Sequence, residues 1–441
     1  MNYRQAQNYL DSFINYERSP LFPYKTSFKL ERVARFLLLL GNPHQDLRII
    51  HVAGSKGKGS TCAFTAHILS AAGYKVGLYT SPHLVDVRER MQILEGKSAR
   101  LISPRDFTRL VEKIRPSAER LRDSEFGRLS YFEIITAIGF LFFQEKKCDF
   151  AVIETGLGGR LDATNASLAL VAVVTPISYE HTQVLGATLE EIASEKAGII
   201  KPGTAVVITA PQKPAVLKII RERARINRAK LYCVGKDIKI QKKQFSGRSQ
   251  RFALNGALGS YPKLSLRLLG EHQLVNAAVA VAAVAALKEI GISINRRAIA
   301  QGLRKTQWPG RLELISKDPR IVLDGAQNRE SARVLQKALK ATFHFRNLIL
   351  VLGVCYDKDV RGILDELTPS ASQIILTKSA NPRAMEPAEI KALMNTINKP
   401  VSLTRNLSEA LAMAKKNASR EDLVVVTGSL FLAGEAIRMW R

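Results

Sequence analysis

His51-Val-Ala-Gly-Ser-Lys-Gly-Lys-Gly-Ser-Thr61 is the stretch of sequence that decides the fold. Apolar residues run into it, and a small-residue helical pattern that includes Ala63, Ala66 and Leu69 follows it. This order predicts a strand, a glycine turn and a helix. The glycines let the backbone approach an anion, and the free N–H groups at the start of the helix point toward that anion. The stretch therefore predicts a site for the phosphates of a nucleotide.

The side chains of this turn indicate how phosphate would be held. Lys58 is long enough to reach the outer phosphates, and the hydroxyl of Ser60 or Thr61 could contact Mg²⁺. The spacing is not that of the strict phosphate loop, because Val52 stands at the first glycine position and Gly59 separates the lysine from the hydroxyl. A tight structural turn remains the alternative. The candidate phosphate contacts are Gly57, Lys58, Gly59 and Ser60.

The length and composition predict a globular protein of two domains. A chain of 441 residues exceeds what one hydrophobic core usually supports. The longest apolar runs, at 36–40 and 277–287, are too short to span a bilayer, and the first residues lack the apolar core of a signal peptide. The four cysteines are scattered without metal spacing, which favours the reducing cytoplasm.

The charge is strongly positive, at +27 from 66 basic and 39 acidic residues. This balance favours an anionic partner, such as a nucleotide, a polycarboxylate or a nucleic acid. The alternative is a surface that is simply rich in lysine and arginine. The sparse aromatic residues do not alternate with the basic ones as a platform for single-stranded nucleic acid would require, so we expect no nucleic-acid partner.

Strands alternate with helices along the first part of the chain, which predicts an α/β fold with a parallel sheet and helices on both faces. Ligands bind beyond the carboxyl ends of strands in such sheets. The phosphate turn, Glu154 and His181 all fall at that edge. A helix is expected over 104–122, where Pro116 should kink or split it. Strands are expected at 75–80, 150–153, 168–177 and 204–209.

The pattern breaks around 296–310, and we place the domain boundary there. The expected domains are residues 1–298, which contain the predicted phosphate turn, and a smaller α/β domain over 307–441. Residues 231–268 are more polar and predict a small antiparallel appendage. In the second domain, strands are expected at 320–324, 347–353, 373–377 and 422–427.

Three residues at the predicted strand ends form a candidate metal site. Glu154 ends a buried strand before a glycine turn, so its carboxylate could hold a hard cation beside phosphate. His181 could add a nitrogen ligand and Ser81 a hydroxyl. A lone strand-end glutamate is more often a cap or half of an ion pair, and only the convergence of several groups favours the metal. Lys196 is a solvated lysine, a charge partner of this site, or a carbamate formed with CO₂.

Twelve blocks, in order across nearly the whole chain, resemble the folylpolyglutamate synthase/dihydrofolate synthase branch of the Mur ligase superfamily. The resemblance implies a Mur-type, P-loop-like parallel-sheet domain followed by a smaller Rossmann-like domain that binds glutamate. Any one block is modest evidence, whereas the ordered set is highly specific. The blocks are 51–61, 80–84, 89–90, 131–133, 154–165, 180–181, 185–186, 195–201, 272–277, 309–311, 324–328 and 357–359.

The resemblance implies an ATP-dependent ligase that adds L-glutamate to dihydropteroate, to a reduced folate, or to both, through an acyl phosphate. It implies two Mg²⁺ ions and a monomer. Phosphate contacts would come from Gly57, Lys58, Gly59 and Ser60, and Asn276 would contact the nucleotide. Ser81, Glu154 and His181 would hold one Mg²⁺, and carbamylated Lys196 the second. Arg311 and Asp324 would reach phosphate and ribose from the second domain. The pterin pocket would include Ser130, Phe132 and Asp162.

Three positions depart from the family pattern. Lys56 replaces an asparagine, Glu180 replaces an aspartate, and Gln327 stands where a histidine is usual. Gln327 leaves a binding-only homologue as one alternative. The others are a Mur ligase acting on a cell-wall or storage-peptide precursor, and a P-loop NTPase acting on nucleic acid. The sequence does not decide between dihydrofolate synthesis, polyglutamate extension and both.

Overall fold

The computed structural model describes residues 1–441 except 18–26, 123, 247–248, 395–398 and 441. Its larger domain is built on an eight-stranded sheet in the order β4-β3-β2-β5-β1-β6-β7-β8. Six neighbouring strands are parallel, namely β2, β5, β1, β6, β7 and β8. The β3–β4 hairpin adds an antiparallel edge beside β2. The strand bounds are β1 Arg48–Ala53, β2 Val76–Tyr79, β3 Met91–Glu95, β4 Ser98–Leu101, β5 Phe150–Glu154, β6 Ala169–Val174, β7 Val206–Thr209 and β8 Lys230–Cys233.

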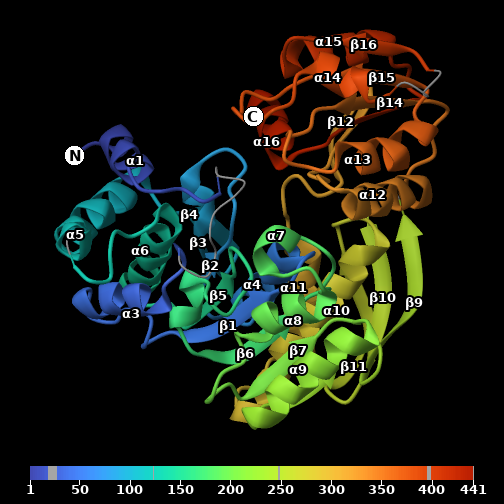
Figure 1. Ribbon diagram of the computed structural model, residues 1–441. Helices are drawn as coiled ribbons and strands as arrows, with labels where there is room; N and C mark the ends of the chain where they lie inside the picture. Colours follow the sequence, from blue (N-terminus) through green and yellow to red (C-terminus); the bar gives the residue numbers. More distant parts are fainter. Residues whose placement is uncertain (18–26, 123, 247–248, 395–398, 441) are drawn as a thin grey trace.

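Helices cover both faces of this sheet, as the predicted α/β class requires (Figure 1). Alternate residues of β1 and β6 face opposite sides, so β6 is apolar throughout and β1 is apolar except for Arg48 and His51. The α4 face carries α4 (Lys58–Ala71), α10 (Glu271–Ala285) and α11 (Arg296–Lys305). The opposite face carries α1 (Tyr3–Asp11), α3 (Leu30–Leu39), α5 (Pro104–Arg122), α6 (Tyr131–Glu145), α8 (Leu189–Ala197) and α9 (Pro214–Ile226). The fold class and the strands predicted for this domain are confirmed.

The α5 helix runs without interruption through Pro116, so the prediction of a split at that residue is wrong. A proline inside a helix removes one backbone hydrogen bond and strains the turn before it. The buried side chains of this 19-residue helix, among them Phe107 and Ile114 before the proline and Leu121 after it, hold it against the domain on both sides. Packing therefore outweighs the local propensity to break.

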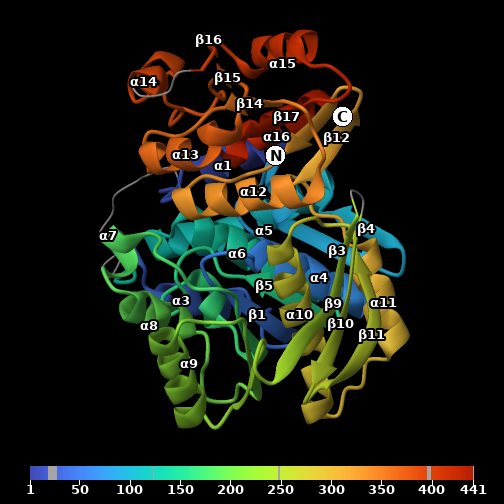
Figure 2. The same ribbon diagram turned by 90° about the vertical axis from the view of Figure 1, so that its right-hand side faces the viewer.

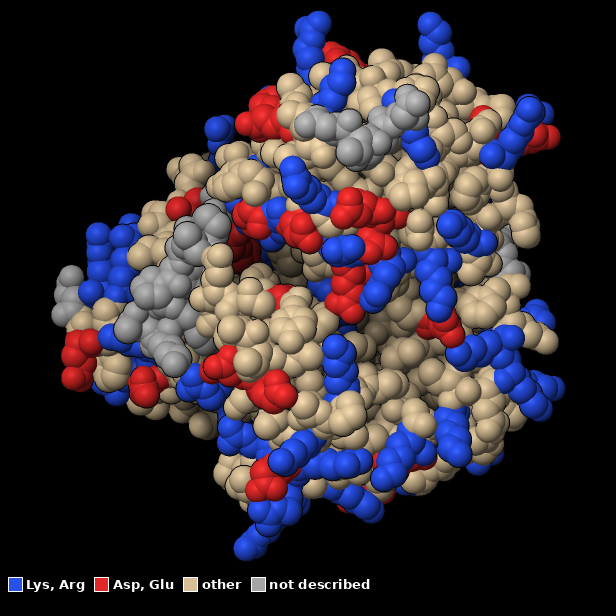
Figure 3. Space-filling model, turned by 45° about the vertical axis from the view of Figure 1, so that its right-hand side comes forward, with Lys and Arg blue, Asp and Glu red and all other residues tan. Residues whose placement is uncertain are grey.

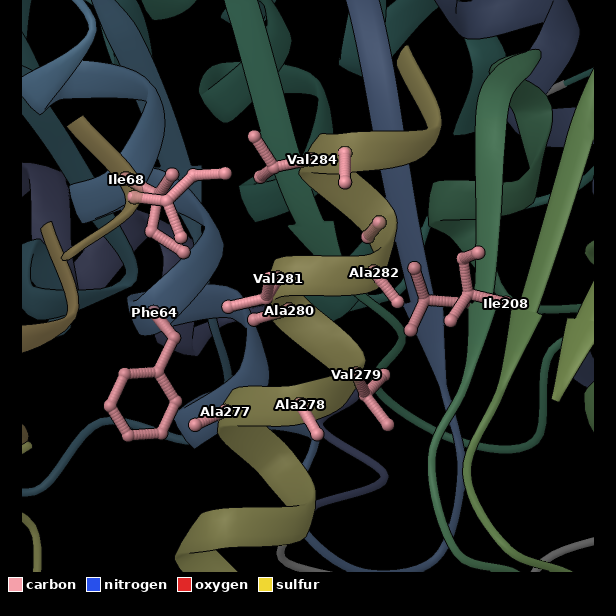
Figure 4. Close-up of a cluster of buried hydrophobic side chains, with 14 of the residues drawn as sticks. Phe64, Ile68, Ile208, Ala277, Ala278, Val279, Ala280, Val281, Ala282 and Val284 are labelled. Carbon is pink, nitrogen blue, oxygen red and sulfur yellow. The ribbon is translucent and has the colours of Figure 1, made fainter. Parts of the chain in front are cut away.

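The α10 helix is apolar on all sides because it is enclosed. Its small residues lie between Phe64 and Ile68 of α4 and the sheet, where Ile208 lies beside Val279 and Ala282 (Figure 4). The continuous helical stretch Glu271–Ile290 is long and apolar enough to cross a membrane by length and composition, contrary to our estimate from the apolar runs alone. Some 78% of the most apolar part of this stretch is buried inside the protein, so the stretch is a core helix here.

The contact between α11 and α4 depends on a glycine. A Cβ at Gly302 would collide with the backbone of Ile68, so we expect Gly302→Ala to force the two helices apart. The expected loss of stability is about 1–3 kcal/mol, seen as a lower Tm in thermal unfolding. Arg297→Ala, an exposed substitution on the same helix, is the control. An unchanged Tm for Gly302→Ala would contradict the close packing.

A three-stranded antiparallel sheet stands beside α10 and α11, in the order β11-β10-β9. Its strands are β9 (Ile238–Ser246), β10 (Ser249–Gly256) and β11 (Gly259–Leu266). The predicted antiparallel appendage is therefore confirmed, although β8 at its start joins the main sheet instead. The α11 helix crosses residue 298, at which we had placed the end of the first domain, and packs against α4 and β11.

The second domain contains a six-stranded sheet in the order β12-β13-β17-β14-β15-β16, parallel except for β12. All four strands predicted here are present. The pattern missed the short edge strands β12 and β16. The bounds are β12 Glu313–Lys317, β13 Arg320–Leu323, β14 Leu348–Leu352, β15 Gln373–Leu376, β16 Val401–Leu403 and β17 Leu423–Thr427, with α12 Arg329–Thr342, α13 Val360–Leu367, α14 Pro387–Ala392, α15 Leu407–Asn417 and α16 Leu430–Trp440.

The loop that follows β2 belongs to the first domain and packs against the second. Leu84 and Val85 pack against the second domain's core, and a Cβ at Gly434 of α16 would collide with the carbonyl of Leu84. The same loop begins at Ser81, beside the carboxyl end of β5. The contact therefore places the second domain over the edge of the sheet at which the sequence predicts the site (Figure 2).

Candidate active site

The phosphate turn lies between β1 and α4 and depends on close backbone packing. Gly57 has a φ of +83°, and a Cβ there would collide with the side-chain amide of Asn276. Asn276 donates to Gln273 Oε1 at 3.0 Å, and Gln273 Nε2 donates to Ser60 Oγ at 3.3 Å. The α10 helix thus positions both the turn and the first residues of α4. The predicted residues Gly57, Ser60 and Asn276 are brought together.

Three lysines surround a single carboxylate beside this turn. Lys58 Nζ and Lys196 Nζ each donate to the carbonyl oxygen of Gly54, both at 3.0 Å. Lys196 is 1% exposed and also donates to Glu180 Oε1 at 2.7 Å. Lys56 lies 3.6 Å from the other oxygen of Glu180. We call these four charged residues the lysine cluster.

The lysine cluster carries more positive than negative charge. Burial alone would raise the pKa of Glu180, but the ammonium groups of Lys196, Lys58 and Lys56 lower it to about 2. Burial lowers the pKa of Lys196 below its ordinary value, although Glu180 opposes this shift. Glu180 therefore stays ionised and neutralises one of the three cations. The remaining charge suits a polyphosphate at the N-terminus of α4.

Glu154 ends β5 as a buried carboxylate without a paired cation. It accepts one hydrogen bond, from the backbone N–H of Ser81 at 3.1 Å, and no ion pair is formed with it in the part of the chain that the structure describes. Burial raises its pKa. A buried carboxylate in this condition needs a cation to stay ionised, so its chemistry fits a Mg²⁺ ligand.

The predicted metal ligands are only partly assembled. Ser81 meets Glu154, whereas His181 is exposed at the start of α7 (Thr182–Leu185), with a φ of +47°. No hydrogen bond among the described residues joins His181 to either of the other two. The described residues also contain no group of three or more His, Cys, Asp or Glu side chains placed to hold a metal.

Two predicted residues come from the second domain. Asp324 accepts hydrogen bonds from the backbone N–H groups of Leu312 and Ala326, both at 2.9 Å. Leu312 has a φ of +46°, so Asp324 holds an uncommon backbone conformation directly after Arg311. Arg311 lines the same cavity as Glu154, which brings a cation of the second domain to the carboxylate of the first.

The indole of Trp308 is a site feature that we did not predict. A Cβ at Gly59 would lie 3.1 Å from its ring, so Trp308 lies directly over the phosphate turn. The sequence signal was Gln307-Trp-Pro-Gly, which we interpreted only as a break between domains. Both Gly59 and Trp308 line a cavity of about 800 Å³ between the two domains.

The three predicted pterin contacts do not line this cavity. Ser130 caps α6 in a buried capping box with Glu133. Asp162 is fully buried and accepts from the N–H groups of Leu157 and Thr164, at 2.8 and 3.0 Å. Phe132 is 9% exposed and packs edge-on to Tyr79. Ser130 and Asp162 therefore fix local backbone in this structure.

Fold and site together define a Mur-type ligase, with a phosphate-binding sheet domain closed by a second α/β domain. Two family models match the chain: the Mur ligase middle domain over residues 128–284, and the Mur ligase, glutamate ligase domain over residues 310–430. The chain belongs to the folylpolyglutamate synthase/dihydrofolate synthase family of these ligases. The resemblance given by the sequence blocks is thereby confirmed.

The similarity extends over nearly the whole chain. Dihydrofolate synthase/folylpolyglutamate synthase of Bacillus subtilis is 35% identical over 92% of this chain and 93% of its own length. Folylpolyglutamate synthase of Mycobacterium tuberculosis in complex with ADP superposes with a TM-score of 0.90, at 31% identity, covering 99% of this chain and 98% of that one. An FPGS–AMPPCP–folate complex gives a TM-score of 0.84 at 31% identity, covering 100% of this chain and 99% of that one. The chain is an ATP-dependent ligase that joins L-glutamate to a pteroate or folate carboxylate.

Proposed function

We propose that the enzyme activates its pteroate or folate carboxylate as an acyl phosphate, using ATP bound at the glycine turn. The carboxylate oxygen takes the γ-phosphoryl group and ADP leaves. The amine of L-glutamate then attacks the acyl carbon, loses a proton, and phosphate departs with the electrons of the broken C–O bond. The observation that carries this proposal is the lysine cluster, in which three buried or half-buried cations have one carboxylate among them.

The phosphates of ATP would lie against Gly57, Lys58, Gly59 and Ser60. Lys58 would exchange the carbonyl of Gly54 for a phosphate oxygen, and Lys196 would keep that carbonyl satisfied. Asn276 would contact the nucleotide from α10. Arg311 and Asp324 would act from the second domain, on phosphate and ribose respectively. Both reactants are anions, so we expect catalysis to depend mainly on positioning and charge neutralisation.

Mg²⁺ would be held by Glu154 and Ser81, with His181 joining after a local rearrangement of the turn that precedes α7. The ion supplies charge neutralisation at the phosphates and orients them. A second Mg²⁺ would bind Lys196 as a carbamate. The ion pair of Lys196 with Glu180 would then be replaced by two anions that share the metal, with Lys56 beside them.

Glu154→Gln is expected to lower Mg²⁺-dependent turnover about 100-fold or more, because the amide keeps the shape but not the charge. ADP release measured across a Mg²⁺ titration would give a higher apparent requirement for the ion. Glu95→Gln, the same change at an exposed position of β3, is the control. Wild-type Mg²⁺ dependence in Glu154→Gln would contradict the assignment.

The remaining assignments follow from the placement of the elements. Residues 1–298 would bind ATP and the pteridine substrate, with α11 completing this domain, and residues 307–441 would bind glutamate. Phe132 would face the pterin, and Ser130 and Asp162 would hold the backbone around it. The protein would act as a monomer. Its four cysteines are free and buried, which suits the reducing cytoplasm.

We propose no nucleic-acid partner. On the face drawn in Figure 3, Lys and Arg side chains are spread widely, and Asp and Glu gather beside the hollow between the domains. A nucleic-acid surface would instead present a continuous basic stripe.

The test that separates the family's activities is ADP release by the purified protein with ATP, Mg²⁺ and L-glutamate. Dihydropteroate and tetrahydrofolate would be supplied in parallel. Release with dihydropteroate alone means a dihydrofolate synthase, with tetrahydrofolate alone a polyglutamylating enzyme, and with both a bifunctional one. If neither substrate supports release, the enzyme acts on another substrate of the Mur type or Gln327 has removed the activity. Gln327→His, which restores the usual histidine, is then the variant to test.

A further inference from the structure

The cavity between the domains continues well beyond Glu154. It follows α4 from Gly59 near the start of the helix to Ser70, 11 residues later, which is about 17 Å at the rise of an α-helix. The far end lies between the tip of the β3–β4 hairpin and the last turn of α11, which share one side of the molecule (Figure 2). A ligand that reacts at Glu154 therefore has a long path along the cavity leading away from the reacting end.

Four cations line this far end, and we call them the basic arm. They come from the hairpin tip, the segment after β11 and the end of α11. All four are exposed, and none of their side chains makes a hydrogen bond or ion pair with another described residue. They differ in this from Lys243 and Lys337, which share Glu271. The members of the basic arm are Lys97, Arg267, Arg304 and Lys305.

No acidic group of the cavity balances the basic arm. The two carboxylates in the cavity wall are Glu89 and Glu154. Glu89 accepts from the N–H groups of Leu84, Val85 and Asp86 in the loop after β2, and Glu154 belongs to the reaction site. The other titratable group near the arm is His67, whose pKa falls to about 4 through burial and the nearby Lys305. His67 is therefore neutral at pH 7 and does not change the charge of the basic arm. The positive charge of the arm has no counter-ion in the cavity wall.

We propose that the basic arm binds the middle of the oligo-γ-glutamyl tail of a folate substrate, which would loop out between the pterin at Phe132 and the terminal carboxylate at Glu154. This rests on the proposed function, in which each turnover adds one residue and hence one further carboxylate. The tail is flexible and carries separated negative charges, which suit four unpaired cations gathered at the end of a path of about 17 Å. The triphosphate of ATP is compact and has its own site at the lysine cluster. Nucleic acid fits poorly, because the cavity wall has no Phe or Tyr and its single Trp308 lies at the reacting end.

The test uses the double variant Arg304→Glu, Lys305→Glu. Substrates would be the monoglutamate and pentaglutamate forms of tetrahydrofolate, with kcat/KM measured from ADP release. The ratio of the monoglutamate to the pentaglutamate value should rise about 10-fold, and the wild-type ratio should also rise with added salt. The matched control is Arg296→Glu, Arg297→Glu, which reverses two exposed charges at the other end of α11. A double-variant ratio equal to that of wild type would overturn the proposal.

A binding measurement separates this proposal from the proposed function. A fluorescent penta-γ-glutamate peptide without a pteridine should bind the wild-type protein, and the double variant should bind it several-fold more weakly. If no folate or pteroate supports ADP release, the proposed function fails and peptide binding alone decides the basic arm. The same holds for an enzyme that accepts dihydropteroate only. Absence of peptide binding, or tighter arm-dependent binding of a single-stranded oligonucleotide of equal charge, would overturn the proposal.

Discussion

Lys58→Ala is expected to lower turnover about 10³-fold while leaving the fold intact. Lys58 begins α4, and its ammonium lies at the carbonyl of Gly54, within reach of a phosphate on the N-terminus of the helix. Removal of one preorganised charge that stabilises a transferring group costs about 10²–10³ in rate. The larger value is expected because the lost cation belongs to a half-buried cluster, where solvent screens it poorly.

The structure indicates why Lys58→Ala should remain folded. The carbonyl of Gly54 keeps the hydrogen bond from Lys196, so no buried acceptor is left unpaired. Thermal unfolding should therefore shift little while ADP release collapses. Lys56→Ala is the matched comparison: its ammonium lies 3.6 Å from Glu180, and it should lose less activity. Near-native turnover of Lys58→Ala would contradict the placement of the ATP site at this turn.

The sequence predicted the elements whose signal is local. Buried parallel strands are continuous apolar runs, so β5, β6 and β17 were evident. The β3–β4 hairpin was hidden by the charged residues that precede it, including Glu89 and Arg90. Helix α11 had a usable signal, with Asn295 as N-cap and Ile299 and Leu303 on its buried face, but the Trp-Pro-Gly that follows it drew attention to a break.

The candidate site was predictable where it depends on topology. Ser81 and Glu154 follow neighbouring strands β2 and β5, and parallel strands bring their carboxyl ends to one edge. Nothing local shows that Trp308 covers Gly59, because the two are far apart in the chain and meet only through the packing of α11 on α4. Nor does a sequence reveal which charges will be buried.

Buried ion pairs illustrate that limit. Arg32 is paired with Glu133 at 2.7 Å, and both are largely enclosed. Arg90 is 1% exposed and pairs with Glu17 at 2.6 Å. Each partner is an ordinary charged residue in the sequence, separated from the other by many positions. The same reasoning explains why Lys196 could be a solvated helix lysine on sequence grounds alone, although the structure places it against Glu180.

Lys196→Ala is expected to lose activity about 10²–10³-fold and to regain part of it when acetate or formate is added. Carbamate formation needs the neutral amine, and burial lowers the pKa of Lys196, which increases the neutral fraction at a given pH. Its Nζ lies 2.7 Å from Glu180, so a carbamate there would face a second carboxylate across a shared cation. A small carboxylic acid could fill the space of the missing side chain and supply the lost anion.

The control for this rescue is Lys201→Ala. Lys201 is also partly buried, but its Nζ donates to the carbonyls of Asn165 and Ser167, at 2.6 and 2.7 Å, and it forms no ion pair with a carboxylate of the described residues. Its loss should lower the Tm, and acetate should not restore activity. If acetate rescues both variants or neither, Lys196 acts as an ammonium rather than a carbamate. The second Mg²⁺ would then have no ligand from α8, and neutralisation at the phosphates would rest on the lysine cluster and on the Mg²⁺ held by Glu154.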